Sequence, residues 1–150
     1  MIPQIRVQAE DFDPGAALAR LEALGGGAVA SFTGLVRGDG GLVEMLLEHH
    51  PAMTAKALGD IADEAARRWP LAGITLIHRH GPLHPGDRIV FVGTASSHRA
   101  AALEACAFLI DWLKTSAPFW KQERFADGAT RWVEARAEDD AATERWQDNG

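Results

Sequence analysis

The segment Asp111–Arg124, D-W-L-K-T-S-A-P-F-W-K-Q-E-R, limits the possible folds of this chain more than any other stretch. It closes a long amphipathic segment and then reaches Pro118, which lacks a backbone N–H and cannot continue a helix. We therefore expect a helix that stops abruptly and an extended segment that follows at once. Lys114 and Lys121 stand on either side of the break.

Those two lysines stand out in a chain that otherwise uses arginine. Of 15 Lys and Arg residues, only Lys56, Lys114 and Lys121 are lysines. Lysine can lose its proton when it is desolvated, whereas arginine stays charged. The placement therefore indicates a site that moves protons. The spacing alone also fits two surface lysines beside a helix end, where cations favour the helix dipole.

Composition narrows the classes of protein. The 150 residues fit one domain, 1–150, with a sizeable core and an acidic tail over about 138–150. A formal net charge of -6 argues against a nucleic-acid partner, which requires a basic surface.

No apolar run is long enough to span a bilayer and the N-terminus lacks a signal-peptide pattern, so we expect a cytoplasmic protein with no membrane partner. The single cysteine, Cys106, excludes an internal disulfide and a cysteine zinc cluster.

The hydrophobic patterns predict an α+β fold, because helices alternate with strands that hairpin turns connect. We expect strands at 4–9, 28–32, 42–48, 74–78, 88–95, 119–125 and 130–135, and helices at 14–24, 51–69 and 98–116. The strand at 42–48 forms either a hairpin or an excursion from the main sheet. Ser96-Ser97 is expected to cap the last helix, residues 81–87 to form turns, and the tail from Glu138 to form a short helix.

Two segments could hold an anion. Ser96-Ser97-His98-Arg99 marks a helix start, where backbone N–H groups, an imidazole and a guanidinium favour phosphate or carboxylate. The alternative is a simple cap followed by a solvated arginine. Arg37 lies in a glycine-rich turn between Gly34 and Gly38, which would let the backbone approach a ligand while the guanidinium donates two parallel bonds. A solvated arginine in a loop is again the alternative.

The helix length restricts how these groups can combine. If residues 98–116 form an unbroken helix, His98 and Lys114 lie roughly 24 Å apart at 1.5 Å per residue. Both cannot touch one small molecule within a single chain. Either the chain carries two sites, or one site is shared across a two-fold interface in which one copy's helix start meets the other's helix end. We favour the shared site.

Beyond Pro118, strand alternation places Lys121 and Glu123 on one face and Gln122 on the other. The Lys–Glu pair either orients the lysine or is a surface ion pair of little energetic weight. The histidines lack metal-ligand spacing, so no metal is expected. Cys106 fits a small buried hydrophobe, so any sulfur that the protein handles should arrive on another molecule.

Several longer motifs resemble the MoaE family, the large catalytic subunits of molybdopterin synthase. The matching stretches fall between about residues 28 and 146: S-F-T-G-L-V-R (31–37), L-E-H-H-P-A-M-T (47–54), R-W-P (68–70), I-H-R-H-G-P-L-H-P-G-D (77–87), F-V-G-T-A-S-S-H-R (91–99), D-W-L-K-T-S-A-P-F-W-K (111–121) and R-W-V-E-A-R (131–136). The glycine-rich segment after Arg37 looks shorter than in relatives. Leu35 stands where some relatives carry lysine, so this position is expected to contribute backbone rather than charge.

The resemblance implies an α/β-hammerhead fold with a mixed/antiparallel sheet and three main helices. It further implies a homodimer at the centre of a heterotetramer, with a small ubiquitin-like sulfur carrier at each end. The carrier's C-terminal Gly-Gly thiocarboxylate would enter a pocket and deliver two sulfurs to cyclic pyranopterin monophosphate, giving the molybdopterin dithiolene. No cofactor is then required, since the carrier supplies the sulfur. The expected catalytic residues are Lys114 and Lys121, and the expected substrate-binding residues are Leu35, Val36, Arg37, His98, Arg99, Gln122 and Glu123.

Within that set, Arg37, His98 and Arg99 are expected to anchor the substrate. Lys114 is expected to transfer protons and to contact the incoming carboxyl terminus, and Lys121 to stabilise charge or act as a second acid/base. The alternative function is a non-enzymatic module that binds an anion or pterin and acts through a partner protein. A phosphatase-like hydrolase is a third possibility, disfavoured by the absence of a metal-ligand pattern or a reactive cysteine.

Overall fold

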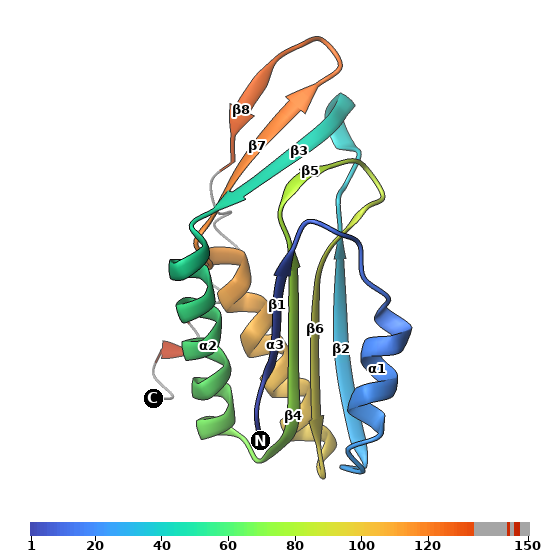
Figure 1. Ribbon diagram of the computed structural model, residues 1–150, viewed down its shortest axis with the longest axis vertical. Coiled ribbons are helices and arrows are strands. Elements are labelled where there is room, and N and C mark those ends of the chain that lie inside the picture. The colour runs from blue at the N-terminus through green and yellow to red at the C-terminus, as the bar shows by residue number, and fades with distance from the viewer. Residues whose placement is uncertain (134–143, 145, 148–150) are drawn as a thin grey trace.

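A four-stranded sheet in the order β1-β4-β6-β2 forms the lower body of the computed structural model (Figure 1), which describes residues 1–133, 144, 146 and 147. Its strands are β1 (Gln4–Gln8), β2 (Ala28–Leu35), β4 (Leu71–Arg79) and β6 (Arg88–Ser96). β1 runs parallel to β4, and the other pairs are antiparallel. The sheet is therefore mixed.

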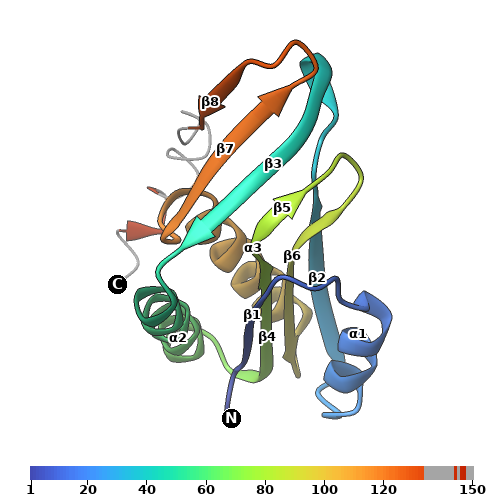
Figure 2. The same cartoon turned by 45° about the horizontal axis from the view of Figure 1, so that its top comes forward.

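A second, wholly antiparallel sheet has the order β5-β3-β7-β8 and projects above the first (Figure 2). Its strands are β3 (Leu42–His49), β5 (Gly81–Leu83), β7 (Phe119–Phe125) and β8 (Thr130–Trp132). A short 3-10 turn, η1 (Asp39–Gly41), leads from β2 into β3. The strand at 42–48 is thus an excursion from the main sheet.

Helices α2 (Pro51–Arg68) and α3 (Arg99–Thr115) cover one face of the first sheet, and α1 (Pro14–Glu22) covers the other. Because successive side chains of a strand point to opposite faces of the sheet, one strand can contribute to the packing on both faces. On β4, Ile74 and Leu76 belong to the larger core cluster with α2 and α3, whereas Ile77 joins Leu21 and Phe91 in the smaller cluster under α1. The predicted α+β class, the mixed and antiparallel sheets and the three main helices are confirmed.

The helix starts show where local sequence rules held and where they failed. The Asp13 carboxylate accepts hydrogen bonds from the backbone N–H groups of Gly15 and Ala16, as expected of an N-cap before a proline. The predicted Ser96-Ser97 cap of α3 is wrong. His98 is the N-cap and makes no side-chain capping bond. Ser96 is the last residue of β6, and its hydroxyl donates to the Pro70 carbonyl at 2.7 Å and accepts from the His98 amide at 3.2 Å.

Other boundaries differ modestly. β2 continues to Leu35, and residues 81–83, expected as a turn, form strand β5 because they pair with β3. The predicted hairpin of β7 and β8 is confirmed up to Trp132. Residues 134–135 of the second expected strand lie outside the described residues, as does most of the tail from 138 that was expected to be helical. Across the described residues, no helix combines the length and the apolar character that crossing a membrane requires.

Gly93 tests how α1 is held on the sheet. A Cβ at this position would collide with Cδ1 of buried Leu21 and lie 2.8 Å from Cε1 of buried Phe91. Gly93→Ala should therefore destabilise the protein by about 1–3 kcal/mol through overpacking. The matched control is Gly59→Ala on α2, where a Cβ meets nothing within 4 Å and helix propensity predicts a gain of about 0.5–1 kcal/mol. Urea unfolding at fixed protein concentration measures both, and equal effects would contradict the packing argument.

Candidate active site

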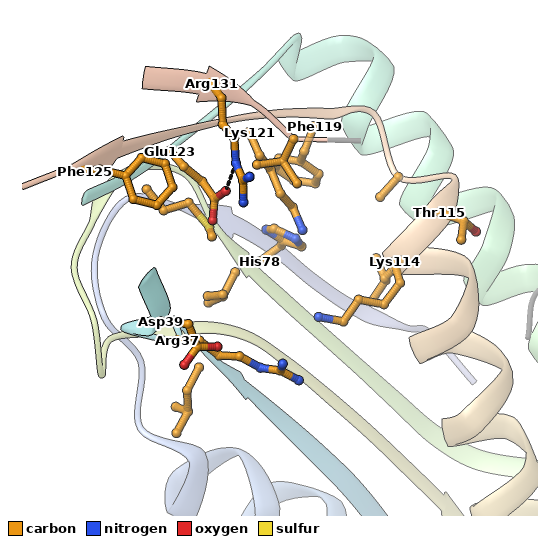
Figure 3. A pocket seen from close by; sticks show the side chains of 16 residues that line it. Arg37, Asp39, His78, Lys114, Thr115, Phe119, Lys121, Glu123, Phe125 and Arg131 are labelled. Carbon is orange, nitrogen blue, oxygen red and sulfur yellow. Dashed lines mark hydrogen bonds and ion pairs between the residues drawn. The ribbon is translucent and has the colours of Figure 1, made fainter. Parts of the chain in front are cut away.

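A cavity of about 470 Å³ opens where the C-terminal end of α3 meets the second sheet and the end of β2 (Figure 3). Its walls come from segments far apart in the chain. The lining residues are Leu35, Arg37, Asp39, Met45, His78, Ile89, Leu113, Lys114, Thr115, Ala117, Phe119, Lys121, Glu123, Phe125, Arg131 and Val133. The cavity thus gathers four cationic side chains, two carboxylates and one imidazole.

The predicted break at Pro118 builds one wall. Helix α3 ends at Thr115, and the Ser116 amide donates to the Trp112 carbonyl at 2.8 Å as the helix closes. The chain then reverses and enters β7 at Phe119. Lys114 in the last helical turn and Lys121 in the strand consequently face the same cavity. The prediction that the two lysines flank one break in structure is confirmed, and they share one space.

Alternation along β7 sorts the next predicted residues. Phe119, Lys121, Glu123 and Phe125 line the cavity, whereas Gln122 is not among its lining residues. The Glu123 carboxylate is mostly buried, with 14% of its side chain exposed, and accepts a 2.9 Å hydrogen bond from Nε of Arg131 on β8. Figure 3 shows this ion pair at the edge of the cavity. Glu123 thus has a partner, Arg131, that lies outside the predicted set.

The end of β2 positions Arg37. Val36 is buried, its amide donates to the Asp87 carbonyl at 2.9 Å, and its carbonyl accepts from the Gly86 amide at 2.9 Å. These two bonds fix the backbone between Leu35 and Arg37, both of which line the cavity. Packing explains the glycine at position 34, because a Cβ there would lie 2.8 Å from Cγ1 of Val90. The reason expected from the sequence was close approach of the backbone to a ligand.

The remaining predicted residues lie elsewhere in the chain. His98 and Arg99 are exposed at the N-terminal end of α3 and do not line the cavity. One copy of the chain therefore brings together Leu35, Arg37, Lys114, Lys121 and Glu123, with Val36 beneath them. This division follows from the length of α3, which separates its two ends by roughly 24 Å at 1.5 Å per residue.

His78 is a cavity residue that the sequence argument considered only as a metal ligand. Its ring is buried and stacks on Phe119, with centroids 3.8 Å apart and an interplanar angle of 13°. Nδ1 lies 2.8 Å from the Arg79 carbonyl, an acceptor, so Nδ1 carries the proton. Burial, together with the positive charges of Lys121 and Lys114, lowers the pKa of His78 to about 4. The overlooked signal was alternation on β4, which places Ile74, Leu76 and His78 in one inward-facing row.

A second histidine lies behind this stack. The His49 ring is 5.4 Å from the Phe119 ring and 4.7 Å from the His80 ring, and its Nδ1 is 2.9 Å from the Thr54 hydroxyl. Burial and the neighbouring histidines lower the pKa of His49. Despite this grouping, no three His, Cys, Asp or Glu side chains converge on a metal position anywhere in the described part of the chain. Cys106 is buried, as predicted, and burial raises the pKa of its thiol to about 11.

The neutral state of His78 should make stability depend on pH. The unfolded chain takes up a proton near the ordinary value of 6.5, whereas the folded chain resists until about 4. The stabilisation is thus complete above pH 6.5 and is lost as the pH falls towards 4, by on the order of 3 kcal/mol. His78→Gln, which does not titrate, should lose less stability between pH 7 and 4.5 in urea unfolding. His49, present in both proteins, contributes in the same direction and cancels in the comparison. Parallel pH profiles would contradict burial as the cause.

Comparisons with known proteins agree on one family. The family model described as MoaE protein matches residues 7–116. The molybdopterin synthase catalytic subunit of Pseudomonas aeruginosa is 56% identical over 96% of this chain and 99% of its own. A solved structure, molybdopterin cofactor biosynthesis protein E from Burkholderia multivorans, superposes with a TM-score of 0.83 at 48% identity, covering 97% of both chains.

A complex of subunits 1 and 2 of molybdopterin-converting factor from Helicobacter pylori shares the fold at a TM-score of 0.70 and 19% identity, over 91% of this chain and 92% of that one. With a family model covering most of the chain and near-complete alignment to close relatives, this chain belongs to the MoaE protein family.

Proposed function

We propose that this chain is the catalytic subunit of a molybdopterin synthase, which transfers two sulfurs to cyclic pyranopterin monophosphate to form the molybdopterin dithiolene. The observation that carries the proposal is the convergence of Lys114, Lys121 and Arg37 in one cavity at the junction of α3 and β7. The 56% identity to a curated catalytic subunit supports the same reading.

The cavity suits the charge changes of this reaction. Opening a cyclic phosphate and adding sulfur at adjacent carbons develops negative charge and requires proton transfers. Arg37 offers a planar, permanently charged donor for the phosphate, and the two lysines can both stabilise anions and exchange protons. We assign Lys114 the acid/base role and contact with the incoming carboxyl terminus. Lys121 then stabilises developing charge or serves as a second acid/base.

The sulfur donor in this proposal is a small ubiquitin-like carrier. A C-terminal Gly-Gly segment has no side chains, so its thiocarboxylate can enter a narrow cationic space and meet the lysines. The related Helicobacter pylori protein was solved as a complex of two subunits, which supports a second subunit here. In this scheme the carrier brings the sulfur, and the buried Cys106 takes no part because its thiol stays protonated.

The site is completed across a homodimer in our proposal. His98 and Arg99 are exposed at one end of α3, and Lys114 lies at the other. The helix surface between them presents Leu103, 61% exposed, beside the small residues Ala100 and Ala107. Two antiparallel α3 helices packed through this surface would set one copy's His98 and Arg99 beside the other's Lys114. The substrate phosphate would then meet cations from both copies.

Lys114→Arg separates catalysis from simple anion binding. Arginine keeps the charge but cannot give up a proton, so kcat should fall about 100-fold or more if Lys114 transfers protons. The assay supplies thiocarboxylated carrier and cyclic pyranopterin monophosphate and measures dithiolene product. Lys56→Arg, at an exposed i,i+4 pair with Asp60, is the matched control and should be fully active. Full turnover by the Lys114 variant would exclude Lys114 as a proton-transfer residue and leave it a purely electrostatic role.

Mixed dimers test the shared site. His98→Ala and Lys114→Ala should each be inactive as homodimers, whereas their heterodimer carries one intact site. A statistical mixture should therefore recover about a quarter of wild-type activity. Mixing Lys114→Ala with Lys121→Ala is the control, because both residues belong to the same chain's half of the site and no intact site can form. Recovery in the control, or none in the test mixture, would refute sharing.

A further inference from the structure

We propose that His78 is a substrate-recognition residue of the cavity: its Nε2 accepts a hydrogen bond from an N–H or O–H group of the bound ligand. The proposal rests on the proposed function for the identity of that ligand, a pterin with several N–H donors. His78 would add a hydrogen-bond acceptor to a cavity in which the cations are all hydrogen-bond donors. The cations bind the anionic group of the ligand, and His78 accepts a hydrogen bond from a donor group of the same ligand.

The tautomer of His78 is fixed by the backbone. Nδ1 is 2.8 Å from the Arg79 carbonyl, which can only accept, so the proton resides on Nδ1 and the lone pair on Nε2. Stacking on Phe119 at 3.8 Å fixes the plane of the ring, and a flip within that plane would break the hydrogen bond from Nδ1 to the Arg79 carbonyl. His78 is therefore held as an acceptor with one orientation.

Nε2 is also open to the cavity. Among the described residues, every buried side-chain nitrogen or oxygen has a hydrogen-bond partner, and the one bond His78 makes uses Nδ1. Nε2 therefore keeps some solvent-accessible surface, in a residue that is 6% exposed and lines the cavity. Figure 3 shows the imidazole among Phe119, Lys121 and Lys114. An acceptor in that position, desolvated on its other sides, gains most from a ligand donor.

The surroundings keep His78 from becoming a donor. The charged or titratable groups that face it are Lys121 on β7, Lys114 on α3 and His49 on β3, and all three disfavour a proton on its ring. Together with burial they leave the imidazole neutral at physiological pH. Apart from the carboxylates of Asp39 and Glu123, the ionisable groups lining the cavity are cations or this neutral acceptor. A ligand that carries both an anionic group and a hydrogen-bond donor fits this lining.

Two variants separate recognition from structure. His78→Phe keeps the ring and its stack on Phe119 but removes the acceptor, so the Kd and KM for cyclic pyranopterin monophosphate should rise about 10- to 100-fold. His78→Gln places an amide near the position of Nε2 and should restore most of that loss. The KM for the thiocarboxylated carrier should stay the same in both variants, which a general structural defect would not allow.

A measurement independent of turnover completes the test. The ¹⁵N resonance of Nε2 in the full-length protein should report an unprotonated nitrogen and should move when cyclic pyranopterin monophosphate is added. An unmoved resonance, or unchanged Kd and KM in His78→Phe, would overturn the role of His78 while wild-type dithiolene formation still supported the proposed function. Binding with a moved resonance but without dithiolene product would overturn the proposed function and leave His78 as the acceptor. Absence of binding would refute both.

Discussion

The antiparallel pairing of β3 with β7 is the interaction on which the candidate site depends. It joins the strand that leaves the first sheet after β2 to the strand that follows α3, and the register sets Leu47 opposite Lys121 and Met45 opposite Glu123. Because β3 leads directly into α2 and β7 follows directly from α3, the pairing also closes the upper end of the helical layer (Figure 1). The pairing therefore holds β7, with Lys121 and Glu123, as one wall of the cavity.

The cavity is positively charged although the protein as a whole is negatively charged. The chain carries a formal net charge of -6, so an anionic ligand meets repulsion from the body of the protein. Inside the cavity the balance is reversed, since Arg37, Lys114, Lys121 and Arg131 outnumber Asp39 and Glu123. The Glu123–Arg131 pair cancels internally, which leaves the two lysines and Arg37 as the dominant field. A low effective dielectric at a partly enclosed site strengthens that field.

Much of this arrangement could be predicted from local sequence because local physics determines it. Pro118 had to end α3, and alternation had to place Lys121 and Glu123 together on β7. The helix length correctly separated His98 from Lys114. Long-range contacts were beyond such rules. Residues 81–83 become a strand only because β3 lies beside them, and Ser96 is held in β6, with its hydroxyl donating to the distant Pro70 carbonyl, instead of capping α3. His78 has its place in the cavity wall beside Phe119, a residue distant in sequence that stacks on its ring.

The backbone clamp at Val36 has a consequence for how the entrance of the cavity can change between family members. The Val36 amide and carbonyl are both hydrogen-bonded to the turn before β6, so the backbone position from which Arg37 extends is fixed before the glycine-rich segment begins. The glycine-rich segment can therefore gain or lose residues without moving the backbone at Val36 and Arg37. Variation in loop length there is then free to tune ligand entry independently of chemistry.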